Sequence, residues 1–377
     1  MPEKSSSSVP IATPFAASTV VSAAVLIDDH QSQHDNVIGT SEPIPVSIRS
    51  DSNKLMRELN FNKNLVKILL NAISTCDLRY YIVDNSGSMD AIDGKIGSKV
   101  VSRYDELCHM LKWHGKLASL TGISSKFIML NNPGHGLPSE IIVNDESSFA
   151  ILKKMLLSDT RGSTPLCATI RYIIANITLI APSLEASGKK AVVIIATDGE
   201  SSDGDIAIAM FPLTRLPVKV IIRLCTNNER IIQYWNKIEE DLELELDVLD
   251  DLNGEATEIH ILNPWLNYNE KIHRLREFGN LPNEFDYIDE RELSLTQIRN
   301  IASYILDIQI EDLPDPNTDL LAFETEVQQQ QANVESEFDI YSQTIKPWFN
   351  FEENNTNYII TTIIMVFVAI MIMLFFK

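Results

Sequence analysis

The sequence predicts a doubly wound α/β domain with a mostly parallel, Rossmann-like sheet, helices on both faces, and one C-terminal transmembrane helix. Strand-like and helix-like segments alternate between residues 76 and 310, the pattern of such a sheet. The run KAVVIIATDG at 190–199 is apolar on both strand faces, which indicates a strand covered by helices on each side. Residues 358–376 carry no charge over 19 positions, which predicts a membrane span.

Local patterns predict the individual elements of this domain. Leucines recur at helical spacing over 52–75, so we expect an amphipathic helix there, broken near Asn62. Strands are expected at 80–84, 126–131, 190–199, 218–224 and 258–262. Helices are expected at 103–119, 146–157, 165–180, 204–211, 228–242 and 293–306.

Composition divides the chain into five parts. The first 50 residues are rich in Ser and Pro, with two Gln, which predicts a disordered tail; its short apolar stretch resembles a signal peptide only weakly, since prolines and hydroxyls interrupt it. Acidic residues and glutamines fill the stretch before the membrane span, which predicts a linker. The expected parts are a tail at 1–50, a helical lead-in at 51–75, the α/β domain at 76–310, the linker at 311–357 and the membrane helix at 358–376.

The apolar segment Tyr358–Phe376 has the length of a membrane span. Nineteen residues at a rise of ~1.5 Å cover ~28 Å, close to the ~30 Å hydrocarbon core. Only Lys377 follows, so we expect a type IV tail anchor with the folded domain in the cytosol. The scarcity of basic residues around the segment favours the endoplasmic reticulum over the mitochondrial outer membrane, by resemblance to tail anchors in general. A lipid-attachment signal also ends in an apolar tail, but it requires entry into the secretory pathway.

Charge and cysteine content exclude some classes of function. The chain has 52 acidic and 31 basic residues and a net charge of −21, which argues against nucleic-acid binding through the phosphate backbone. Its four cysteines form no CxxC pair and have no histidine at zinc-ligand spacing, so no zinc site is predicted; the even number leaves disulfides open.

Polar residues collect where two predicted strands end. One strand ends at Asp84 and is followed by Ser86 and Ser88; the other ends at Asp198, and a loop between them contains Thr164. In an open α/β sheet, ligands bind at the carboxyl ends of the strands. Mg²⁺ prefers oxygen ligands, so hydroxyls can bind it directly while carboxylates orient its waters. Such a site has little direct negative charge, and a partner's carboxylate could complete it.

These pieces resemble a known family. DNSGS at 84–88, TPL at 164–166 and TDG at 197–199 resemble, in this order, the metal-ion-dependent adhesion site (MIDAS) of a von Willebrand factor A-type domain. The resemblance covers 76–310. It implies a bound Mg²⁺ (or Mn²⁺ or Ca²⁺), a partner protein that supplies a carboxylate, and binding rather than catalysis, so the chain is expected not to be an enzyme. The metal residues that it implies are Asp84, Ser86, Ser88, Thr164 and Asp198.

Other interpretations of the motif fit less well or stay open. No EF-hand loop, GxxxxGK[ST] phosphate loop or GxSxG nucleophile motif is present, and a single helix-capping turn would not explain three matched pieces. The insertion at 90–97 and the extended region 226–290 exceed a minimal A-type domain. The loop acids Asp90, Asp93 and Asp203 could tune a second cation, although exposed acids are usually only solvated.

Two further functions remain open at this stage. One is a secreted or lipid-anchored adhesion protein, which cleavage of the N-terminus and glycosylation would identify. The other is a subunit of a larger ATPase-linked assembly, whose motor would have to be another chain because no ATPase motif occurs here.

Overall fold

The computed structural model describes residues 52–352. The predicted tail at 1–50 and the predicted membrane helix at 358–376 therefore lie outside the described residues, as do the last residues of the predicted linker.

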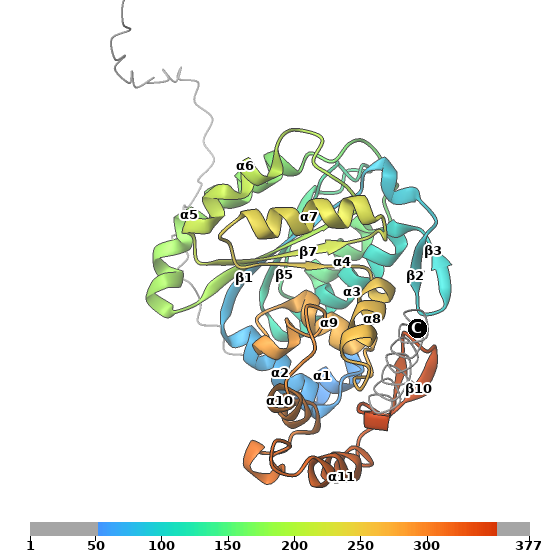
Figure 1. Cartoon of the computed structure of the whole chain (residues 1–377). Helices are drawn as coiled ribbons and strands as arrows, with labels where there is room; N and C mark the ends of the chain where they lie inside the picture. The colour runs from blue at the N-terminus through green and yellow to red at the C-terminus, as the bar shows by residue number, and fades with distance from the viewer. Residues whose placement is uncertain (1–51, 353–377) are drawn as a thin grey trace, which may run out of the picture. The chain divides into compact units, whose positions relative to one another are not determined.

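A six-stranded sheet forms the centre of the described part of the chain (Figure 1). Its order is β5-β4-β1-β6-β7-β8; all neighbours are parallel except β5, which runs antiparallel to β4 at one edge. The strands are β1 Cys76–Val83, β4 Ser124–Met129, β5 Glu140–Val143, β6 Lys190–Thr197, β7 Val218–Leu224 and β8 Leu246–Leu249. The chain extends the sheet in one direction from β1 and then in the other from β6, so the switch point lies between these two strands. The predicted mostly parallel α/β fold is confirmed.

Alternation along β1 explains why its whole apolar run is buried. Tyr81 and Val83 contribute to the core on one face of the sheet, and Tyr80 and Ile82 contribute to the core on the other. Tyr81 pairs in register with Phe127 of β4, and the two rings stack with centroids 4.5 Å apart. β1 is therefore covered on both faces of the sheet, the arrangement that the sequence predicted for the strand at 190–199.

Helices cover both faces of the sheet (Figure 1). Three lie over one face: α5 Leu166–Ser187, α6 Ile206–Met210 and α7 Glu229–Asp241. The other face is covered by α1 Ser52–Leu59, α2 Lys63–Ser74, α3 Arg103–Thr121, α4 Glu146–Met155, α8 Leu252–Leu262 and α9 Glu270–Phe278, with α10 Leu295–Leu306 and α11 Leu320–Gln331 packed beyond them. The helix predicted over 52–75 is thus two helices, because the Asn62 side chain caps α2 by accepting from the backbone N–H of Leu65 at 2.9 Å.

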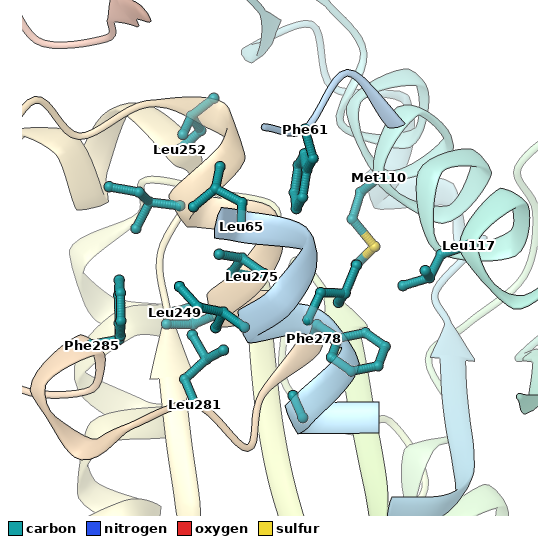
Figure 2. Packing of buried hydrophobic residues seen from close by; sticks show 14 of the residues in the cluster. Phe61, Leu65, Met110, Leu117, Leu249, Leu252, Leu275, Phe278, Leu281 and Phe285 are labelled. Carbon is teal, nitrogen blue, oxygen red and sulfur yellow. The ribbon is translucent and has the colours of Figure 1, made fainter. Parts of the chain in front are cut away.

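Figure 2 shows the core on the second face, where side chains from distant parts of the chain meet. Leu65 of α2 and Met110 of α3 point toward Leu275 and Phe278 of α9. All four are at most 1% exposed, so the lead-in helices belong to the folded unit rather than preceding it.

One predicted element is wrong at the far edge of the sheet. The strand expected at 258–262 is the end of helix α8. The last strand is instead β8, inside the acidic run DLELELDVLDD, where pairing with β7 and burial of Leu249 outweigh the unfavourable composition. Helix α9, strand β5 and the hairpin of β2 Gly94–Ile96 with β3 Lys99–Val101 were not predicted.

The segment predicted as an acidic linker from residue 311 is folded as far as residue 352. It forms α11 and a hairpin of β9 Glu337–Asp339 with β10 Thr344–Lys346. Phe323 and Trp348 are fully buried in the core, and Phe349 makes a β-bridge with Leu266. Its buried aromatic residues are few among many acidic residues and glutamines, so overall composition concealed them.

Within residues 52–352, α5 is the one helix whose length and apolar composition would allow it to cross a membrane. It packs Ile170, Ile173 and Ile177 against the sheet, which accounts for its apolar character.

Candidate functional site

Asp84 joins the ends of the two central strands. It is the first residue after β1, and its backbone N–H donates to the Ala196 carbonyl of β6 at 3.1 Å. Its Oδ2 accepts the Thr197 hydroxyl at 2.6 Å, and its Oδ1 accepts the Ser86 backbone N–H at 2.9 Å. Burial raises the pKa of this carboxyl, and these hydrogen bonds offset part of the rise. Asp84 is therefore held by the protein through both carboxylate oxygens.

A chain of hydrogen bonds links the serines of the first motif to the acid of the third. The Ser86 and Ser88 hydroxyls lie 3.0 Å apart, and Ser88 Oγ donates to Asp198 Oδ1 at 2.8 Å. Ser86 and Asp198 are buried, whereas Ser88 is exposed in the 3₁₀ turn Gly87–Asp90. The structure thus brings four of the predicted residues, including Asp84, to the switch point, with Ser88 on the solvent side.

The loop that contains Thr164 is fastened to both of these strand ends. Gly87 donates its backbone N–H to the Gly162 carbonyl at 3.2 Å, which joins the loop to the β1 end. Thr164 donates its backbone N–H to Ser202 Oγ at 3.0 Å, and the Ser202 N–H returns to the Thr164 carbonyl at 2.9 Å. Thr164 is 8% exposed. All five predicted metal residues therefore lie on three loops that backbone hydrogen bonds hold together.

Asn85 supports the site and was not predicted. It is fully buried, its Oδ1 accepts the Asn131 backbone N–H at 2.8 Å, and its Nδ2 donates to the Asn131 carbonyl at 2.9 Å. The Asn131 side chain in turn donates to the Ser163 carbonyl at 2.8 Å. Asn85 and Asn131 together connect the first loop to the end of β4 and to the Thr164 loop.

Arg103, at the start of α3, is the second residue that the sequence did not point to. Its Nη1 donates to Asp198 Oδ2 at 2.8 Å. Its Nε and Nη2 donate to the two carboxylate oxygens of Asp93 at 2.7 and 2.5 Å. The guanidinium lowers the pKa of Asp93, chiefly through these hydrogen bonds. No motif contains Arg103, and only the fold brings it to Asp198.

The remaining loop acids have protein partners. Besides Asp93, Asp90 accepts the Thr160 hydroxyl, and Asp203 caps α5 by accepting the backbone N–H groups of Cys167 and Ala168 at 2.9 and 2.8 Å. Each of the three loop acids that could tune a second cation therefore already has a structural role.

Hydroxyls and carboxylates make up the donor set at the switch point, and these are the oxygen ligands that hard cations prefer. In residues 52–352, no group of three or more His, Cys, Asp or Glu side chains is arranged to hold a metal ion. A cation at this site would therefore depend on the hydroxyls of Ser86, Ser88 and Thr164.

Comparisons with known proteins give structural likenesses only. No family model matches the sequence, and no curated protein matches it. A von Willebrand factor type A protein from Catenulispora acidiphila is similar over 46% of this chain and 39% of its own, with 18% identity and a TM-score of 0.31. The conserved hypothetical protein BatB from Bacteroides thetaiotaomicron is similar over 47% of this chain and 92% of its own, with 17% identity and a TM-score of 0.32.

The pilus adhesin SpaC from Lactobacillus rhamnosus GG is similar over 62% of this chain and 31% of its own, with 12% identity and a TM-score of 0.28. This chain thus spans well under two thirds of the first of these proteins and of the adhesin. All these TM-scores lie below 0.5.

Proposed function

We propose that this chain is a membrane-anchored protein-binding module that engages a partner through a divalent cation at the switch point. The observation that carries the proposal is the chain of contacts Ser86–Ser88–Asp198, beside Asp84, at the carboxyl ends of β1 and β6. The cation is Mg²⁺, or Mn²⁺ or Ca²⁺ in its place, and an acidic side chain of the partner completes its coordination.

The roles of the site residues follow from their exposure and partners. Ser86, Ser88 and Thr164 would provide neutral oxygens, while Asp198 lies within hydrogen-bond reach of Ser88. Asp84 would orient bound water, because its two oxygens already accept hydrogen bonds from Thr197 and Ser86. The exposed side of the site, at Ser88, is where a partner's carboxylate would enter.

The membrane part of the proposal rests on composition. Residues 358–376 would anchor the domain by its C-terminus, facing the cytosol, with the endoplasmic reticulum favoured. Anchoring raises the local concentration of the domain for partners at the same membrane and adds no contacts to the site.

Ser88→Ala is the variant that tests the metal site. Ser88 is exposed, so its loss should leave the fold intact, whereas replacing the buried Asp84 would also remove the hydrogen bond that joins the end of β1 to Thr197 of β6. We expect full-length protein in detergent to bind Mn²⁺, measured by electron paramagnetic resonance, and Ser88→Ala to bind it on the order of tenfold more weakly.

Ser147→Ala is the matched control. Ser147 is exposed and also donates to a carboxylate, that of Asp145 at 2.9 Å, but it lies at the start of α4. Its Mn²⁺ affinity should equal that of the wild type. Absence of Mn²⁺ binding by the wild type, or equal binding by Ser88→Ala, would refute the metal site. Recovery of the same partner proteins with and without a chelator would refute the metal bridge.

A further inference from the structure

We propose that Arg103 is a resident cation that competes with the divalent metal for Asp198, with Asp93 as the partner that retains its guanidinium when the metal is bound. This inference rests on the proposed function and concerns the regulation of the same site. It predicts two states: one in which Arg103 closes the site, and one in which the metal holds Asp198.

In the described structure, Asp198 is fully engaged by the protein. Its Oδ1 accepts the Ser88 hydroxyl at 2.8 Å and its Oδ2 accepts Arg103 Nη1 at 2.8 Å. The Asp198 side chain is 1% exposed, so water cannot replace either partner without local rearrangement. A metal that used Asp198 would meet a carboxylate whose charge the guanidinium already neutralises.

Arg103 and the divalent metal are both positively charged, so they repel each other and cannot both bind Asp198. An arginine in a protein stays protonated, so Arg103 keeps its positive charge at every pH where the protein is folded. Burial weakens solvent screening around Asp198, which strengthens both the attraction of this carboxylate for one cation and the repulsion between two. The metal therefore binds at the cost of the Arg103–Asp198 contact.

Asp93 gives the guanidinium a second position. Its two carboxylate oxygens accept Nε and Nη2, the paired geometry that arginine and a carboxylate prefer. The Asp93 side chain is 39% exposed and lies on the loop that precedes β2. The backbone N–H of Arg103 donates to the Ala91 carbonyl of this loop at 3.0 Å, which keeps the loop next to Arg103. Arg103 can thus leave Asp198 while it keeps two hydrogen bonds to Asp93.

Helix stability does not explain the position of Arg103. It is the first residue of α3, after the capping residue Ser102, where the helix dipole disfavours a positive charge. The contacts with Asp198 and Asp93 account for a cation at this place.

Arg103→Gln and Asp93→Asn separate this proposal from a purely structural role, because it predicts opposite effects on metal affinity. Arg103→Gln removes the competitor, so Mn²⁺ should bind on the order of tenfold more tightly, within the usual range of coupling between two ligands. Asp93→Asn leaves Asp198 as the only carboxylate for Arg103, so Mn²⁺ should bind several-fold more weakly. A structural role would weaken binding in both variants.

Arg230→Gln is the control for net charge. Arg230 is 80% exposed and pairs with Glu200, two residues from Asp198, so this variant removes the same charge near the site without touching Asp198. Its Mn²⁺ affinity should lie within about twofold of the wild type, since surface charges are well screened.

If Arg103→Gln is less stable than the wild type, thermal unfolding provides a second measurement of metal binding. Without metal this variant leaves a buried, uncompensated carboxylate at Asp198, so its melting temperature should fall, and Mg²⁺ should raise it more than in the wild type. Arg103→Lys, which keeps the charge but lacks the planar fork, should bind Mn²⁺ less tightly than Arg103→Gln.

The proposal is overturned if Arg103→Gln binds Mn²⁺ no better than a wild type that does bind it; the metal site itself would then stand. If the wild type neither binds Mn²⁺ nor is stabilised by Mg²⁺, the proposed function fails and the competition fails with it.

Discussion

Gly162 is the residue on which the position of the Thr164 loop depends. Its φ is +76°, in the left-handed region, and its carbonyl accepts the Gly87 N–H at 3.2 Å. A Cβ at this position would lie 2.3 Å from Asn131 Oδ1, so a side chain cannot fit while Asn131 donates to the Ser163 carbonyl.

We therefore expect Gly162→Ala to shift this loop and to lower both stability and Mn²⁺ affinity. Gly136→Ala is the matched control: its φ is +70°, but nothing lies within 4 Å of the added Cβ. The control should lose about 1–2 kcal/mol of stability from backbone strain alone, measured by urea unfolding, with unchanged Mn²⁺ affinity. Equal losses in both variants would show that the contact with Asn131 has no effect.

The residues of the candidate site differ in whether a short sequence motif identifies them. Asp84, Ser86 and Ser88 lie within five positions, and Asp198 ends the most apolar strand, so sequence alone could select them. Whether they hold a metal stays a prediction. Asn85 lies inside the same motif but carries no recognisable signal, because its role depends on Asn131 at the end of another strand.

At the scale of elements, the segment from α11 to β10 differs most from its prediction. In α11, Phe323 and Val327 are fully buried in the core, while Leu321 on the same helix is 73% exposed. Composition averages over such residues, so an acidic, Gln-rich stretch can still be part of the fold.

Phe323→Ala should destabilise the domain by about 3–5 kcal/mol, because it removes a buried ring and leaves a cavity. Leu321→Ala, on the same helix, should change stability by less than about 0.5 kcal/mol. Urea unfolding of both variants measures the difference. Similar small effects from both would mean that 311–352 behaves as the linker that composition predicted.

Across the whole molecule, carboxyl groups gather around the outer strand β8. Burial, with the repulsion of neighbouring carboxylates, raises the pKa of Glu239 to about 7, of Asp247 to about 6 and of Asp250 to about 7. These groups bind protons more tightly in the folded protein than in the unfolded chain. The stability that they provide is complete below about pH 4 and is lost as pH rises through 6 to 7.

His273 has the opposite effect on the pH dependence of stability, and its effect falls in a lower pH range. Burial lowers its pKa to about 4, so it adds stability as pH rises to its unfolded value near 6.5 and nothing further above that. Above pH 6.5 the contribution of His273 levels off, and the loss from the carboxyl groups is larger. We expect the melting temperature to fall between pH 6.5 and pH 8.

Asp250→Asn should make this fall shallower, since it removes one of the carboxyl groups with a raised pKa. Glu243→Gln changes the same charge on an exposed side chain of the same acidic run and should leave the slope as in the wild type. Melting curves in metal-free buffers across this range measure the slope. A melting temperature that rises from pH 6.5 to pH 8 in the wild type would contradict the prediction.

Sequence patterns are enough to predict the α/β class, most of the strands and helices, and the three pieces of the candidate site. Short-range patterns predict these features: alternation along strands, helical spacing, and polar residues directly after apolar runs. The tertiary structure alone decided that β8 is a strand, that residues 311–352 are folded, and that Arg103 contacts Asp198. In each of these cases the stabilising partner lies far away along the chain, so no local pattern records it.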